Sequence, residues 1–96
     1  MRTCEGRFET ANAAKYAQQL CKHFAHKVEA SFENGVGKAA LPMGPASLHA
    51  FEDRLVVRVS GRDAQALEAA RYVIDAHLRR FAFREAFEHM AWEGEC

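Results

Sequence analysis

Four cationic or titratable side chains fall within six residues of this chain, at the point where an expected helix ends. The run reads Lys22-His23-Phe24-Ala25-His26-Lys27. Lysine and protonated histidine donate charge-assisted hydrogen bonds, which are the bonds that a carboxylate or phosphate accepts most strongly. Histidine also changes charge close to neutral pH. The cluster therefore predicts a local site for an anionic ligand.

A second basic run lies at the end of another expected helix. It reads Arg79-Arg80-Phe81-Ala82-Phe83-Arg84-Glu85, and His77 lies on the flank of the same helix. If the two helices lie side by side on a sheet, their C-terminal ends can converge into one cationic hollow. The predicted ligand-binding residues are Lys22, His23, His26, Lys27, His77, Arg80 and Arg84.

A structural explanation of both runs stays open beside this one. Positive side chains in the last turn of a helix interact favourably with its macrodipole, each by about 0.3–1 kcal/mol. Each run would then cap only its own helix, with Glu85 pairing one arginine at little net gain.

Catalysis and metal binding have less support. His23 and His26 lie one helical turn apart, as metal ligands often do, but two histidines are a weak signal and Cys21 is expected on the buried side. We therefore predict no metal and no cofactor. An enzyme would use His23 or His26 as a general base, with Arg80 or Arg84 stabilising a developing anion.

Nucleophilic catalysis and RNA binding are weaker still. The serines fall in strand or turn patterns, and the chain has no GxSxG motif and no glycine-rich phosphate loop. The aromatic residues near the end of the second helix could stack on bases, although such spacing is more typical of a core.

Hydrophobic periodicity predicts the elements that would hold the two runs. Residues 2–9 alternate as a strand, and Thr10 or Asn12 begins a helix that ends near His26. Residues 28–33 alternate again before Asn34-Gly35, a dipeptide suited to a type I′ turn. This turn sets Phe32 opposite Gly37 in a hairpin.

The second half of the chain continues the pattern. Residues 42–45, Pro-Met-Gly-Pro, predict a connection outside any strand, because proline lacks the N–H that a ladder needs. A second hairpin spans residues 47–59 with a turn at Glu52-Asp53. Asp63 then caps a long helix that ends near Phe81. Residues 83–92 predict a last strand.

These elements predict an α+β fold in one domain over residues 1–96. The order β-α-β-β-β-β-α-β places both helices on one face of an antiparallel sheet, as a two-layer sandwich. The other face is either solvated or forms a partner site, such as a homodimer interface. It would carry Glu5, Arg7, Glu29, Ser31, Val36, Lys38, His49, Phe51, Val56 and Arg58.

Composition limits the partners. Thirteen Lys and Arg balance thirteen Asp and Glu, so no global field draws in nucleic acid or an anionic membrane, whereas a homodimer meets no repulsion. No stretch resembles a signal peptide or a membrane span. The three cysteines, an odd number without paired spacing, predict neither a disulfide framework nor a zinc site. We therefore expect a soluble protein in a reducing cytoplasm.

The two basic runs also resemble the signature stretches of a bacterial family, domain of unknown function 2218. The stretches are Lys22 to Lys27 and Arg80 to Glu85, and the order of elements matches as well, over nearly the whole chain. The resemblance implies bacterial origin and a compact domain without an assigned activity. Some members are joined to siderophore-interacting flavin reductases, which implies a role around iron uptake.

Three hypotheses follow. The first is a noncatalytic module that binds an anionic ligand or partner at the basic helix ends, for example an iron chelate. The second is a small enzyme with a histidine base. The third is a structural homodimer through the open sheet face, which Phe51→Asp would disrupt.

Overall fold

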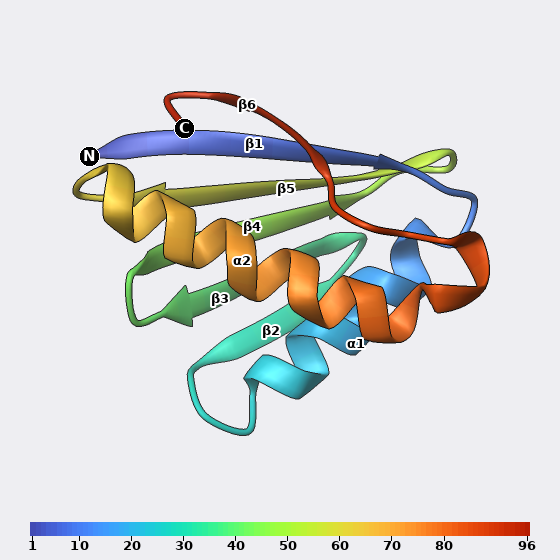
Figure 1. Cartoon of the computed structure of the whole chain (residues 1–96). Coiled ribbons are helices and arrows are strands. Elements are labelled where there is room, and N and C mark those ends of the chain that lie inside the picture. The colour runs from blue at the N-terminus through green and yellow to red at the C-terminus, as the bar shows by residue number, and fades with distance from the viewer.

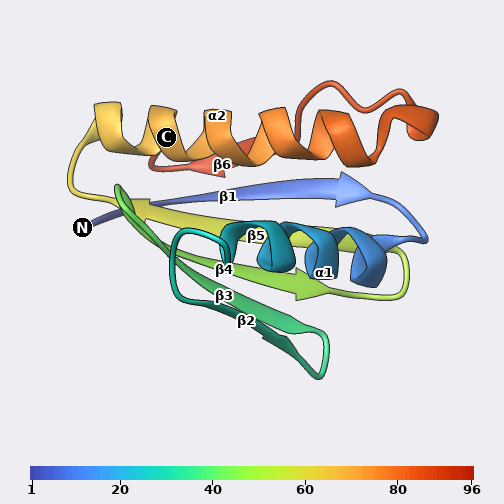
Figure 2. The same ribbon diagram turned by 90° about the horizontal axis from the view of Figure 1, so that it is seen from below.

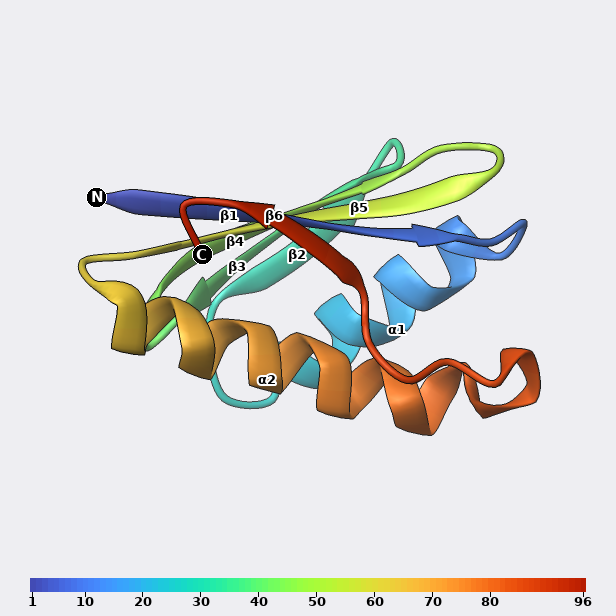
Figure 3. The same ribbon diagram turned by 45° about the horizontal axis from the view of Figure 1, so that its top comes forward.

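A six-stranded antiparallel sheet carries two helices on one face in the computed structural model, which describes residues 1–96 (Figures 1 and 3). The strand order across the sheet is β2-β3-β4-β5-β1-β6. The predicted α+β sandwich and its order of elements are confirmed. The elements are β1 (Arg2–Glu9), α1 (Ala13–Phe24), β2 (Ala30–Glu33), β3 (Val36–Leu41), β4 (Gly44–Ala50), β5 (Arg54–Gly61), α2 (Ala64–Phe81), the 3-10 helix η1 (Phe83–Glu85) and β6 (Ala91–Gly94).

One hydrophobic core lies between the sheet and the helices. It contains 21 buried residues, and α1 contributes to it at the three- and four-residue spacing that its sequence predicts. The helix ends at Phe24, slightly earlier than predicted. The Phe24 carbonyl accepts the N–H groups of both Lys27 and Val28, at 3.0 and 2.9 Å, and this turns the chain toward β2.

The first predicted hairpin is confirmed in turn and register. Asn34 and Gly35 have φ angles of 53° and 78°, and Phe32 pairs with Gly37. A Cβ atom at Gly37 would lie 2.5 Å from the Cys21 sulfur. Glycine at this position therefore lets α1 pack directly against the backbone of β3.

The prediction that residues 42–45 lie outside the strands is wrong in part. Only Pro42 and Met43 form the turn, whereas Gly44 and Pro45 begin β4. The Ala40 N–H bonds Glu29 on the other side of β3, so Ala40 and its partner Pro45 form a non-hydrogen-bonded pair. The proline nitrogen therefore faces β5, whose pairing with β4 begins only at Ala46, and the missing donor is not needed.

The predicted strand over residues 83–92 is also wrong in part. Residues 83–85 form η1, Ala86 is left-handed at φ 54°, and only residues 91–94 pair with β1. The Asp75 carboxylate of α2 accepts bonds from the Met90 N–H and the Trp92 Nε1–H, both at 2.9 Å. These long-range bonds hold the start of β6 against α2.

The prediction of no disulfide is wrong. Cys4 of β1 and Cys96 form a disulfide across 92 residues of sequence, with their Cα atoms 5.2 Å apart. The bond follows from the pairing of β6 with β1, which brings the two marked chain ends together (Figure 1). The cysteines therefore no longer support a reducing compartment. Neither helix has the length and apolar character needed to cross a bilayer.

The two helices run in opposite directions along the sheet (Figure 2). The shorter α1 nevertheless ends beside the later turns of α2, where the His23 and His77 rings meet. Just beyond the end of α2, Glu85 instead lies at the start of α1, where it accepts hydrogen bonds from Asn12 and Tyr16. The prediction that the two C-terminal ends converge is wrong in part: Arg80 and Phe81 of the last turn of α2 lie near His23, whereas η1 beyond α2 lies at the start of α1.

Candidate functional site

A hollow of about 320 Å³ lies between the end of α1, the turn that joins β3 to β4, and α2. Although the chain has thirteen acidic residues, none of them lines this hollow. Its lining residues are His23, Phe24, His26, Lys27, Val28, Leu41, Pro42, Met43, Val73 and His77.

The lining divides into an apolar floor and a basic rim. Phe24 and Leu41 belong to the buried core, and Val28, Met43 and Val73 pack against that core. The rim side chains of His23, His26 and Lys27 are exposed, and that of His77 is half-buried. The hollow therefore suits a molecule with an apolar body and a negative group.

Two histidine rings from different helices lie against each other at the rim. The centroids of His23 and His77 are 4.4 Å apart, and the rings are tilted by 52°. The His77 Nδ1 atom lies 2.7 Å from the Val73 carbonyl oxygen. A carbonyl only accepts hydrogen bonds, so Nδ1 carries the proton and Nε2 is the nitrogen that can gain one.

The pKa of His23 lies below its ordinary value of 6.5. The largest cause is desolvation by burial, followed by the positive fields of His77, Arg80, His26 and Lys27. All of these neighbouring groups oppose the protonated form. The surroundings of His23 therefore favour its neutral form at neutral pH.

The rim cations have no acidic partner. The ion pairs of the structure are Arg54 with Asp53 and Arg58 with Glu5, and both lie elsewhere. Lys22 and His23 do lie in the last turn of α1, so a favourable interaction with the helix dipole operates here as well. The dipole does not account for His77, which comes from the side of another helix.

The structure brings together four of the seven predicted site residues. His23, His26, Lys27 and His77 line the hollow, and Arg80 lies close enough to lower the pKa of His23 without lining it. Lys22 lines a separate hollow of about 190 Å³. Arg84 lies on η1 with its guanidinium 5.6 Å from the Phe83 ring centroid, and it does not line the hollow.

Sequence reasoning missed the apolar floor. Val28, Leu41, Pro42, Met43 and Val73 come from three separate segments, and no local pattern connects them. It also misassigned Glu85, which was expected to pair with an arginine. The only partial signal for the floor was the Pro42-Met43 pair, which the sequence placed in a connection outside the strands.

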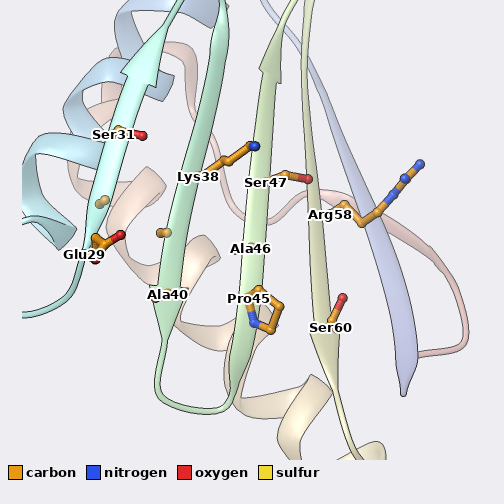
Figure 4. A pocket seen from close by; sticks show the side chains of 11 residues that line it. Glu29, Ser31, Lys38, Ala40, Pro45, Ala46, Ser47, Arg58 and Ser60 are labelled. Atoms are coloured by element: carbon orange, nitrogen blue, oxygen red, sulfur yellow. The ribbon is translucent and has the colours of Figure 1, made fainter.

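The open sheet face carries a larger hollow of about 480 Å³ (Figure 4). Figure 4 shows Lys38 beside Ser47, and Arg58 pointing away toward β1, where it pairs with Glu5 at 2.8 Å. Because Glu29 lines this hollow and Arg58 is already paired, the positive charge of the hollow is partly neutralised. It is therefore the weaker candidate for anion binding.

Comparisons with known proteins agree with the fold. The chain is similar to the protein in the NMR structure of PA4090 from Pseudomonas aeruginosa, with a TM-score of 0.82 and 28% sequence identity over 99% of this chain and 98% of that one. No curated protein matches the sequence. The model of a bacterial family, described as uncharacterized protein conserved in bacteria (DUF2218), matches residues 5–93. With nearly the whole sequence matched, both basic runs included, the chain belongs to this family.

Proposed function

We propose that the protein is a noncatalytic binding module for a small organic anion, which it holds in the hollow at the end of α1. The observation that carries this proposal is the lining: an apolar floor, a rim with His26 and Lys27, and no acidic residue. An apolar body would pack on Val28 and Met43, and the rim would donate charge-assisted hydrogen bonds to the anionic group. A carboxylate, sulfonate or phosphate ester meets this requirement.

A short-chain sulfonate tests the proposal by isothermal titration calorimetry. We expect hexanesulfonate to bind with a Kd on the order of 1 mM, since a ligand of this size gains about 0.3–0.5 kcal/mol per heavy atom. Hexylammonium, which has the same chain and the opposite charge, should not bind. Equal binding of the two would refute recognition of the anion.

The double variant His26→Ala, Lys27→Ala tests the rim. It should weaken hexanesulfonate binding at least tenfold, which corresponds to about 1.4 kcal/mol for two lost charge-assisted bonds. Its free energy of unfolding should change by about 1 kcal/mol or less, because both side chains are exposed at a helix end. Lys22→Ala is the matched control: it removes a cation from the last turn of α1, next to the varied residues in sequence but outside this hollow.

An iron chelate is one ligand of the proposed class. The family resemblance suggests it through the members joined to siderophore-interacting flavin reductases. Ferric citrate, an anionic complex, should then displace hexanesulfonate from the protein. Displacement by citrate alone to the same extent would show that iron contributes nothing to recognition.

The enzyme hypothesis has one supporting feature. The lowered pKa of His23 leaves a neutral imidazole at neutral pH, which is the form that a general base needs. No Ser, Thr or Cys side chain lines the hollow, and Arg84, a predicted anion stabiliser, lies elsewhere. Turnover of a bound ester, lost in His23→Gln, would favour an enzyme over a binding module.

A homodimer through the open sheet face remains the third proposal. The hollow on that face is floored by small side chains, including Ala40 and Ser47, onto which a second copy could pack. Phe51, the residue chosen to test it, lies just after β4 and is 45% exposed, with the Arg54 guanidinium 4.2 Å from its ring centroid. A doubled mass in solution that Phe51→Asp reduces to a monomer would support the dimer.

A further inference from the structure

We infer that the hollow takes up its anion together with a proton, which the His23–His77 pair gains on binding. This inference rests on the proposed function, because it concerns the same hollow and the same class of ligand. It adds a regulatory property, namely that the protein holds the anion in mildly acidic conditions and releases it as the pH rises.

The geometry of the pair favours a single shared charge. The two ring centroids are 4.4 Å apart, and the His77 Nδ1–H already donates to the Val73 carbonyl at 2.7 Å. Two imidazolium rings at this separation would repel each other, so such a pair gains its first proton much more readily than its second. One proton is therefore the expected stoichiometry.

The charged groups around the pair all have the same sign. His26 and Lys27 face His23 from the turn after α1, and Arg80 faces it from α2 beside His77. The turn between β3 and β4 contributes Pro42 and Met43 to the hollow, which carry no charge. Every neighbouring charge that the protein supplies opposes protonation, and the lowered pKa of His23 agrees with this.

A bound anion reverses the balance. A negative group at the rim lies among the same histidines, so it attracts the proton that the cations repel and raises the pKa of His23 above its value in the free protein. Between the two pKa values, binding of the anion takes up a proton. Affinity is highest below the free pKa and falls as the pH rises through the bound pKa.

Calorimetry counts this proton directly. Hexanesulfonate keeps its charge across the pH range, so any pH dependence comes from the protein. At about pH 7, binding heats measured in Tris and in triethanolamine should differ in proportion to an uptake of about 0.3–0.5 proton. The Kd should increase about tenfold between about pH 5.5 and about pH 8.

Two variants assign the proton. His23→Gln and His77→Gln each remove one ring of the pair, and each should reduce proton uptake to below about half of the wild-type value at matched ligand saturation. Lys22→Ala, a cation of the same helix outside this hollow, should retain full uptake. Because His23 is exposed, its replacement by glutamine is expected to leave the fold intact, which an amide spectrum checks.

The outcomes separate this inference from the proposed function. Saturable binding with equal heats in both buffers and a constant Kd would overturn the proton coupling and leave the binding module standing. Uptake that survives in both glutamine variants would also overturn it, because the proton would then belong to another group such as His26. No binding of hexanesulfonate at either pH would overturn the proposed function and the inference with it.

Discussion

Glu85→Ala is the substitution with the clearest expected effect on stability. The carboxylate accepts hydrogen bonds from Thr10 Oγ1 at 2.8 Å, from Asn12 Nδ2 at 3.1 Å and from the Tyr16 hydroxyl. Thr10 and Tyr16 are only 6% and 4% exposed, so alanine leaves two buried hydroxyls without this partner, at about 1 kcal/mol each. The exposed Asn12 adds little, and the lost charge at the start of α1 adds about 0.3–1 kcal/mol.

The expected total is about 2–3 kcal/mol, which corresponds to a fall in Tm of about 10–20 °C for a domain of this size. Urea denaturation followed by circular dichroism measures the free energy, with Glu88→Ala as a control that removes a nearby exposed carboxylate. A second readout is the pKa of Tyr16, which burial and the Glu85 bond raise to about 12 and which the variant should lower. A loss below about 0.5 kcal/mol, or one equal to that of Glu88→Ala, would refute the reasoning.

Three further predictions concern the same fold. The pKa of Glu85 is lowered, chiefly by the Tyr16 bond, so the stability that its charge provides is present above about pH 4.5 and is lost as the pH falls through the lowered pKa. Glu85→Gln should reduce this loss of stability at acidic pH, as measured by urea titrations at several pH values. An unchanged loss would contradict the prediction. Asp75→Ala leaves the Met90 N–H and the Trp92 indole without their acceptor, so we expect the free energy of unfolding to fall by about 2–3 kcal/mol. The fluorescence of Trp92, the only tryptophan, should shift to the red. An unchanged emission spectrum would show that β6 docks without Asp75. Cys96→Ser removes the disulfide that closes a loop of 92 residues, so the free energy of unfolding should fall by about 2–4 kcal/mol in non-reducing urea titrations. The difference between the variant and the wild type must vanish when both are measured in reductant.

The fold could be predicted because its determinants are local. The alternation in β1, the spacing of buried residues in α1, the Asn34-Gly35 turn and the Asp63 cap, which accepts the Ala66 N–H at 2.9 Å, each depend on a few neighbouring residues. The start of β4 was missed because the cost of proline depends on which side of the strand is paired. That pairing belongs to the assembled sheet.

The candidate site could be predicted only in part, for the same reason. His23, His26 and Lys27 are neighbours in sequence, and His77 was included for its place on the flank of α2. The direction of one helix relative to the other decides which residues meet, and composition does not encode it. In the folded chain Arg84 does not line the hollow, Glu85 bonds the start of α1, and the turn between β3 and β4 adds Met43 to the floor.

Chemical-shift mapping of hexanesulfonate on the ¹⁵N-labelled protein tests the central claim most directly. We expect saturable shifts at the backbone amides of His23, Lys27 and Met43, around the hollow at the end of α1. Shifts gathered instead at Lys38 and Ser47, on the open face of the sheet, would contradict the claim, and so would shifts that never saturate.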